Sequence, residues 1–145
     1  MLRFVCMQIS ELKIDELARA LKRIRGIQAA YLFGSQATRT AGSRSDVDVS
    51  ILVSRRISDR SRQEVNDRAF QIVSRLLGRN DIDLVELNNA PVILRYAAII
   101  HGRPLFVKPG HDTFRLAFRS LQEFEDFRPY LERRRRTLKK QLASI

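Results

Sequence analysis

At 145 residues the chain is long enough for one domain with a sizeable hydrophobic core. Hydrophobic residues make up 44% of it, which excludes a disordered protein, and the single cysteine, Cys6, excludes an internal disulfide and a cysteine-rich metal site. The formal net charge of +11 favours acidic partners such as nucleotides, nucleic acids or an acidic protein surface.

The sequence contains no apolar run of the roughly 18–20 residues that a membrane-spanning helix needs. Its first residues carry only a short apolar patch, which is too weak for a signal peptide. A chain with one cysteine is also typical of a reducing compartment. We therefore expect a soluble, cytoplasmic protein.

The first expected elements are a helix and a strand. Ser10 is placed to cap a helix whose apolar residues recur every three or four positions, and Gly26 is placed to end it. Residues 29–33 form a short, aromatic run that predicts a buried strand, and a Gly-Ser pair follows it. The polar residues 36–45 predict a helical turn and a loop.

Residues 46–53 alternate between polar and apolar side chains, which predicts a strand with one face in the core. Asp46 and Asp48 then project from the same face, about 7 Å apart. Two such carboxylates repel each other unless a cation lies between them, and Mg²⁺ takes oxygen ligands while leaving room for substrate phosphates. This strand therefore predicts a metal site. Gly34 and Ser35 predict a phosphate site, because a glycine allows close backbone approach and the serine offers a hydroxyl and an amide.

The remaining elements alternate between helix and strand. In chain order they are a helix within 55–78 that ends at Gly78, a strand over 82–87, a helix from Pro91 to Gly102 capped by Asn88 or Asn89, a strand over 105–107, and a helix from about 112 to 142 with Pro129 as a point of interruption. This order predicts a single domain, 1–145, of the α/β (α+β) class. A small mixed sheet with packed helices would form its core at about 10–108, and a basic helical segment would follow at about 111–143.

The C-terminal helix carries much of the positive charge, including four arginines at 133–136. The simplest interpretation of this run is a solvated helix face, and the alternative is a docking surface. Aromatic residues recur along the same helix at spacings of three, four and six, which predicts a stripe facing the core. They are Phe114, Phe118, Phe124, Phe127 and Tyr130.

Asp83 is the candidate for a third acid, because it falls inside the strand expected over 82–87. Asp81 follows Gly78 and Asn80, which is typical of a turn, and Glu86 has the opposite phase on the strand. Each acid alone reads as a solvated strand-end charge. The combination of a Gly-Ser pair, a fixed spacer, Asp-x-Asp and a further Asp is hard to obtain from packing alone.

This combination resembles a known signature. Gly34-Ser35, ten residues and then Asp46-x-Asp48 are similar to the motif of the nucleotidyltransferase superfamily that shares the DNA polymerase β palm. The short length and the sequel, Asp83-Leu84-Val85-Glu86-Leu87 followed by Pro91, look more specifically like minimal nucleotidyltransferases. Those are often the MNT antitoxins of HEPN/MNT toxin–antitoxin pairs. The resemblance covers roughly residues 31–107.

The resemblance implies an Mg²⁺-dependent antitoxin that transfers AMP from ATP to a tyrosine of a cognate HEPN ribonuclease toxin and so neutralises it. Asp46 and Asp48 would bind Mg²⁺. Asp83 would complete the metal site or accept the proton of the acceptor hydroxyl. Ser35 and the amides around Gly34 would hold the terminal phosphates of ATP.

Arg39 is a departure from the family pattern, in which a glycine commonly stands at this position. An arginine resists backbone angles that a glycine adopts, so the phosphate loop would be shaped differently. Its side chain either reaches a phosphate oxygen or lies solvated on a helical turn. Arg44, next to the acids, could pair with one of them and weaken the metal site.

Three other functions remain as alternatives to this one. An aminoglycoside-type nucleotidyltransferase acts on a polycation, for which a chain of +11 charge is a poor host. A catalytically idle antitoxin would act by binding alone, and a missing acid would indicate it, but none is missing. Transfer of nucleotides to RNA would need a separate binding domain, for which the chain has little room, so direct nucleic-acid binding is not favoured.

Overall fold

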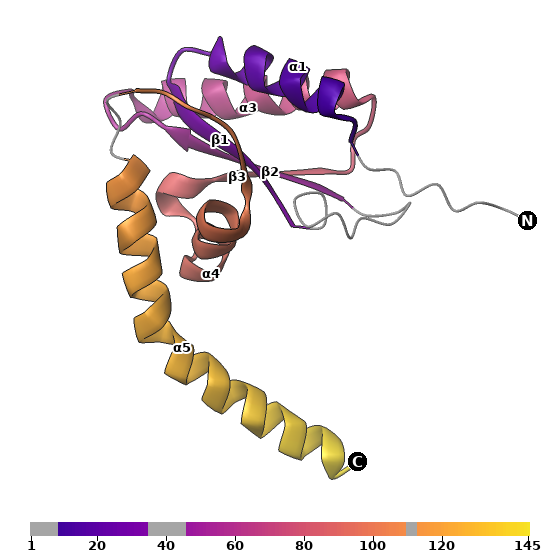
Figure 1. Cartoon of the computed structure of the whole chain (residues 1–145), viewed down its shortest axis with the longest axis vertical. Helices are drawn as coiled ribbons and strands as arrows, with labels where there is room; N and C mark the ends of the chain where they lie inside the picture. The colour runs from indigo at the N-terminus through magenta and orange to yellow at the C-terminus, as the bar shows by residue number, and fades with distance from the viewer. Residues whose placement is uncertain (1–8, 35–45, 110–112) are drawn as a thin grey trace, which may run out of the picture.

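The structure is a computed structural model, and it describes residues 9–34, 46–109 and 113–145 (Figure 1). Four strands and their helices occupy these ranges. In chain order they are α1 (Glu11–Lys22), β1 (Ile27–Phe33), β2 (Val47–Val53), α3 (Asp59–Leu77), β3 (Ile82–Glu86), the short η1 (Leu87–Asn89), α4 (Val92–Tyr96), η2 (Ala97–His101), β4 (Arg103–Val107) and α5 (Thr113–Ala143). The predicted class is confirmed, with a small mixed sheet, packed helices and a long C-terminal helix.

The sheet has the order β3-β2-β1-β4. β1 is antiparallel to both of its neighbours, whereas β2 and β3 are parallel and are joined by α3 in a crossover connection. β4 lies at the edge of the sheet. An edge strand tolerates Pro104, which the sequence analysis placed just outside the strand, because one of its sides needs no backbone donors.

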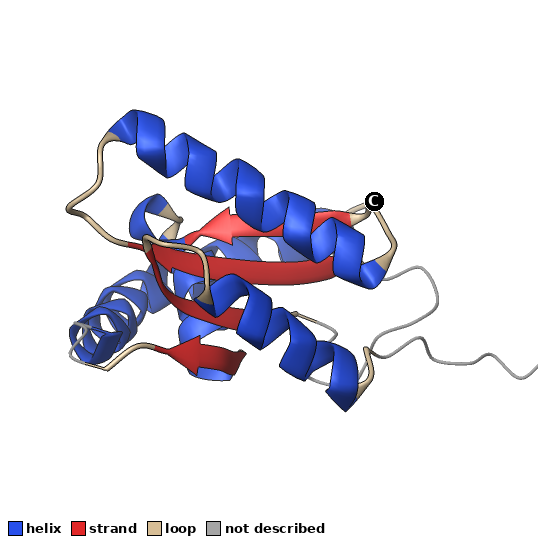
Figure 2. Cartoon of the chain, turned by 90° about the horizontal axis from the view of Figure 1, so that it is seen from above, coloured by secondary structure: helices blue, strands red, loops and turns tan. Residues whose placement is uncertain are grey.

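Helices α1 and α3 cover one face of the sheet and pack against each other (Figures 1 and 2). The expected cap of α1 is confirmed, since the side chain of Ser10 accepts a hydrogen bond from the Lys13 amide. Both helices turn their apolar stripe toward the strands. The buried core on this face comprises Ile14, Leu17, Leu21, Ile24, Ile27, Ala30, Leu32, Val47, Val49, Ile51, Val53, Val65, Ala69 and Val73.

The opposite face of the sheet is covered in part by η1, η2 and the first turns of α5. A second cluster lies here, built from Ala29, Tyr31, Phe33, Leu52, Leu87 and Ala98. Leu116 of α5 packs against it. Further along α5, the ring of Phe124 stacks on that of Tyr96 with centroids 3.8 Å apart, and Glu123 pairs with Arg95. These contacts hold α4 against α5.

The ends of several elements differ from the sequence-based expectation. α1 ends at Lys22, so Gly26 does not stop it and instead occupies the turn before β1 with φ +100°. Gly78 does end α3, in the left-handed conformation that was expected at a helix C-terminus. The prediction of an asparagine cap for α4 is wrong. Pro91 stands at that position, and the side chain of Asn88 hydrogen-bonds the backbone of Val53 instead.

Helix α5 runs without a break from Thr113 to Ala143, so Pro129 does not interrupt it. The prediction of a core-facing aromatic stripe is wrong for most of its members. Phe114 is 81% exposed, and Phe118 and Tyr130 are more than half exposed. The body contacts a different side of the helix through Leu116, and the C-terminal half projects away from the sheet (Figure 1). No helix in the described ranges has the length and apolarity to cross a bilayer.

Candidate functional site

The candidate site residues meet at one end of three neighbouring strands, β3, β2 and β1. In the antiparallel pair β1–β2, Phe33 lies opposite Asp48, and in the parallel pair β2–β3, Asp48 lies opposite Asp83. Gly34 directly follows Phe33, and Asp46 stands just before β2. The register therefore brings together Gly34, Asp48 and Asp83 across three strands, with Asp46 on the side of β2 that Asp48 occupies.

Gly34 lies in contact with the carboxylate of Asp48. A Cβ atom added at Gly34 would stand 2.2 Å from the Oδ2 atom of Asp48, which is far inside van der Waals contact. The residue also has φ +68°, a left-handed conformation that glycine adopts without strain. A glycine is therefore required here for two independent reasons, and both keep the end of β1 tight against the acid.

The carboxylates interact electrostatically. The pKa of Asp48 is raised above its ordinary value, first by burial and then by the charges of Asp83 and Asp46. Asp46 and Asp83 themselves are exposed. Burial and like charges both disfavour the ionised form of Asp48, so a bound cation would relieve an unfavourable arrangement at neutral pH.

The donor set suits a cation held partly by protein and partly by substrate. Within the described residues, no three His, Cys, Asp or Glu side chains form a group able to hold a metal ion by themselves. Mg²⁺ does not require such a group, because it is usually bound through one or two carboxylates plus water and substrate phosphates. Asp46 and Asp48 supply two carboxylates on one face of β2, so the residues present fit this kind of binding.

The neighbouring acids have structural partners. Asp81 is bound by the guanidinium of Arg79, which lowers the pKa of that carboxyl, and its carbonyl accepts a hydrogen bond from the Val47 amide. This agrees with its interpretation as a turn residue. Glu86 is bound by Arg62 and Asn66 of α3, on the opposite side of the sheet from Asp83. Neither acid is available as a fourth ligand.

Arg79 is a residue near the site that the sequence analysis did not identify. Its pKa is raised chiefly by its hydrogen bond to Asp81, and also by the charge of Asp46. Its position two residues before Asp81, in the loop that leads into β3, is the only sequence signal for it. Two of the predicted phosphate-binding residues, Ser35 and Arg39, lie outside the described residues.

Comparison with known proteins places this geometry in context. Residues 15–110 match the family model described as "Polymerase beta, Nucleotidyltransferase". Over 99 residues the chain is 32% identical to the protein adenylyltransferase MntA of Shewanella oneidensis. That alignment covers 68% of this chain and 66% of the relative, so the matched part spans just under two thirds of the relative's length.

Solved structures show the same architecture. A crystal structure of a toxin–antitoxin with AMP-PNP contains a chain that is 25% identical, with a TM-score of 0.60. The similarity covers 92% of this chain and 98% of that one. A structure of a tri-AMPylated Shewanella oneidensis HEPN toxin in complex with an MNT antitoxin has a TM-score of 0.58 at 22% identity, with the same coverage, and shares the fold.

Proposed function

The chain belongs to the polymerase beta nucleotidyltransferase family, and on that basis we propose that it is an antitoxin that transfers AMP from ATP to a tyrosine of a cognate HEPN toxin. The observation that carries the proposal is the row of Gly34, Asp48 and Asp83 across three strand ends, with Asp46 beside it. The relative named a protein adenylyltransferase supports the reaction, and the toxin–antitoxin with AMP-PNP supports the nucleotide. The tri-AMPylated HEPN toxin indicates the kind of acceptor to test.

Asp46 and Asp48 would hold Mg²⁺ together with the phosphates of ATP. When bound, the ion supplies charge neutralisation at the phosphate oxygens. The protein's part is to fix the two carboxylates before substrate arrives. Asp48 is held by the sheet register and by its contact with Gly34, whereas Asp46 stands at the exposed entry to β2. Ser35 and Arg39 remain our candidates for the terminal phosphates.

The transfer itself is a displacement at the α-phosphorus. The tyrosine oxygen forms a bond to phosphorus, the bond from phosphorus to the oxygen bridging the α- and β-phosphates breaks, and pyrophosphate leaves with that electron pair. The hydroxyl proton needs an acceptor. Asp83 lies opposite Asp48 on the next strand, and its charge raises the pKa of Asp48, so it would either accept this proton or complete the metal site.

Intact-mass spectrometry tests this proposal. The cognate toxin is incubated with this protein, ATP and Mg²⁺, and we expect mass increments that match AMP. The variant Asp46→Asn/Asp48→Asn should give none. Asp15→Asn/Asp67→Asn removes two exposed carboxylates on α1 and α3 and should behave as the wild type. A stable complex that forms without any increment in the wild-type reaction would show instead an antitoxin that acts by contact alone.

A further inference from the structure

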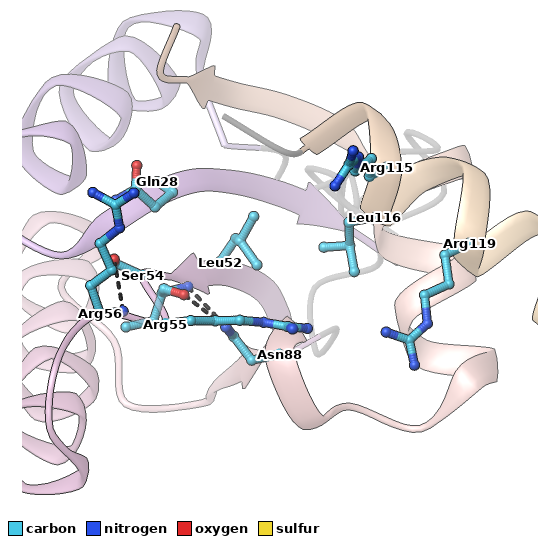
Figure 3. Close-up of a pocket in the computed structure, with 10 residues that line it drawn as sticks. Gln28, Leu52, Ser54, Arg55, Arg56, Asn88, Arg115, Leu116 and Arg119 are labelled. Carbon is cyan, nitrogen blue, oxygen red and sulfur yellow. Dashed lines mark hydrogen bonds between the residues drawn. The ribbon is translucent and has the colours of Figure 1, made fainter. Parts of the chain in front are cut away.

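A cavity of about 570 Å³ lies away from the carboxylates, between the end of β2 and the first turns of α5 (Figure 3). Four arginine side chains line it, and the described part of the chain contributes no Asp or Glu to its lining. We call this cavity the arginine pocket and define it by these four residues. They are Arg55 and Arg56, in the loop after β2, and Arg115 and Arg119 on α5.

The arginine pocket is separate from the carboxylates. Leu52 lines the pocket and lies on the same face of β2 as Asp48. It is four residues further along the strand, so the two residues are about 13 Å apart. The face of the sheet between Asp48 and Leu52 is covered by packed side chains. Ser50 is fully buried, its cross-strand neighbour Tyr31 is 4% exposed, and Ala98 covers this part of the face. A nucleotide held at Asp48 therefore does not extend into the pocket through this packing.

Two arginines of the pocket, Arg55 and Arg56, carry charge that the described acidic side chains do not pair. Arg55 and Arg56 are exposed, and neither forms an ion pair within the described residues. Arg119 donates from Nε to Glu123 at 2.7 Å, but Glu123 also pairs with Arg95 and is shared between two cations. An anion in this space would thus lie between the side chains of Arg55 and Arg119, which point toward one another (Figure 3), without a carboxylate among the described lining residues to repel it.

The chemistry of the lining selects an anion with several oxygen acceptors. A guanidinium has five N–H donors and no acceptor, and its planar fork matches the oxygens of phosphate. The amide of Asn88, which also lines the cavity, is already engaged by the backbone of Val53. Leu52 and Leu116 supply an apolar wall. The volume is within the range of about 300–1,000 Å³ that is typical of small-molecule sites.

We propose that the arginine pocket binds a small ligand that carries several linked phosphate groups, at a site distinct from the carboxylates. Inorganic triphosphate and nucleoside triphosphates share this chemistry. The several negative charges of such a ligand would be complementary to Arg55 and Arg56, and to Arg119, which shares Glu123 with Arg95. An extended nucleic acid suits a continuous basic groove rather than a cavity of this size. The inference does not depend on nucleotidyl transfer, because the pocket would bind its ligand without catalysis.

Isothermal titration calorimetry with sodium triphosphate, in a buffer that contains EDTA, tests the proposal. Removal of divalent cations leaves the carboxylates repulsive to a polyanion, so binding reports on the pocket. We expect one site, with affinity that falls about tenfold or more in Arg55→Gln/Arg56→Gln. The matched control is Arg68→Gln/Arg75→Gln, which neutralises two exposed arginines of α3 and should change the affinity less than about twofold.

The same titration with ATP distinguishes the two sources of the phosphates. Tighter binding of ATP than of triphosphate would assign a nucleotide, and equal binding would assign the inorganic ion. Three results would overturn the proposal. They are no binding to the wild-type protein, an equal loss of affinity in the pocket variant and the control, or Arg55-dependent binding of a short single-stranded RNA in place of triphosphate.

Discussion

Gly34 is the residue whose small size bears most directly on the proposed active site. A methyl group there would collide with the carboxylate of Asp48, and the backbone has φ +68°. Gly78 offers a matched comparison, because its φ is +62° but a Cβ would meet nothing within 4 Å. The two positions share the cost of a left-handed backbone and differ in the collision alone.

We therefore expect backbone strain at positive φ to lower the free energy of unfolding by about 1 kcal/mol in Gly78→Ala and by a similar amount in Gly34→Ala before the collision with Asp48 is added. Gly34→Ala should lose more than this, and it alone should abolish nucleotidyl transfer by displacing Asp48. Thermal unfolding and the intact-mass assay measure the two effects. Equal activity of the two variants would show that the position of Asp48 does not depend on Gly34.

Asp48 and Asp81 should respond to pH with opposite signs. The pKa of Asp48 is raised by burial and by its like-charged neighbours, so its contribution to stability is present below its unfolded pKa of 3.8 and is lost as pH rises through the folded value. The pKa of Asp81 is lowered by Arg79, so its contribution is present above 3.8 and is lost as pH falls.

At neutral pH and with EDTA present, Asp48→Asn should therefore raise the melting temperature, whereas Asp81→Asn should lower it. The difference for Asp48→Asn should shrink as the pH falls through the raised pKa of Asp48 toward 3.8, and the difference for Asp81→Asn should shrink only as the pH falls below 3.8 through the lowered pKa of Asp81. Thermal unfolding at a series of pH values measures this. A melting temperature that drops in Asp48→Asn at neutral pH would mean that this carboxylate is stabilised by contacts other than those described.

At the scale of the elements, Asn88 joins η1 to the end of β2. Its side chain accepts a hydrogen bond from the Val53 amide at 2.9 Å and donates one to the Val53 carbonyl at 2.7 Å. We expect Asn88→Ala to lower the free energy of unfolding by about 1–3 kcal/mol, because it leaves both backbone groups without this partner. Chemical denaturation measures the loss.

Asn89→Ala is the matched control, since Asn89 is exposed and was the other candidate cap for α4. It should change stability by less than about 0.5 kcal/mol. A larger loss in Asn89→Ala than in Asn88→Ala would restore the interpretation of Asn89 as a helix cap.

The elements that were predicted correctly have local causes. Ser10 caps α1, and Gly78 ends α3, because these residues satisfy or permit a backbone conformation within a few positions of themselves. The period-two alternation of β2 also placed Asp46 and Asp48 on one face, and the position of Asp83 within β3 was read in the same way. Local pattern therefore predicted the elements and the acids of the candidate site.

The features that were not predicted depend on what lies opposite an element. The contact between Gly34 and Asp48 follows from the antiparallel pairing of β1 with β2, and nothing in either segment alone specifies it. The aromatic spacing of α5 suggested a buried stripe, yet Phe114 and Phe118 face solvent because the body meets the helix through Leu116. Arg55 and Arg119 are far apart in sequence, so the arginine pocket could not be recognised before the fold was known.

At the scale of the whole molecule, α5 both projects away from the sheet and carries a cluster of positive charge. The C-terminal half of this helix projects from the sheet, and its residues from 132 onward are exposed (Figure 1). Most of the stability of a helix in a protein comes from packing of its apolar face, which this half lacks, so such a segment gains from a partner. The four arginines at 133–136 lie on it, together with the exposed Leu138 and Leu142. This surface suits a partner with acidic and apolar side chains.

If the cognate toxin docks on α5, its affinity should respond to charge and to salt together. Arg134→Glu/Arg135→Glu should weaken the complex about tenfold or more at low ionic strength and much less at high ionic strength, because salt screens exposed charges. The melting temperature of this chain alone should not change, since both residues are exposed. Binding titrations at two salt concentrations, with thermal unfolding of the free chain, make these measurements.

Arg68→Glu/Arg75→Glu is the control, because it reverses the same amount of charge on α3, which covers the other face of the sheet (Figure 1). It should leave the affinity nearly unchanged. The other possible outcomes indicate different modes of docking. An equal loss at both salt concentrations would assign the contact to the apolar residues of α5 rather than to its arginines. Unchanged affinity in Arg134→Glu/Arg135→Glu would show that the basic run is a solvated helix face, and the toxin would then have to dock elsewhere.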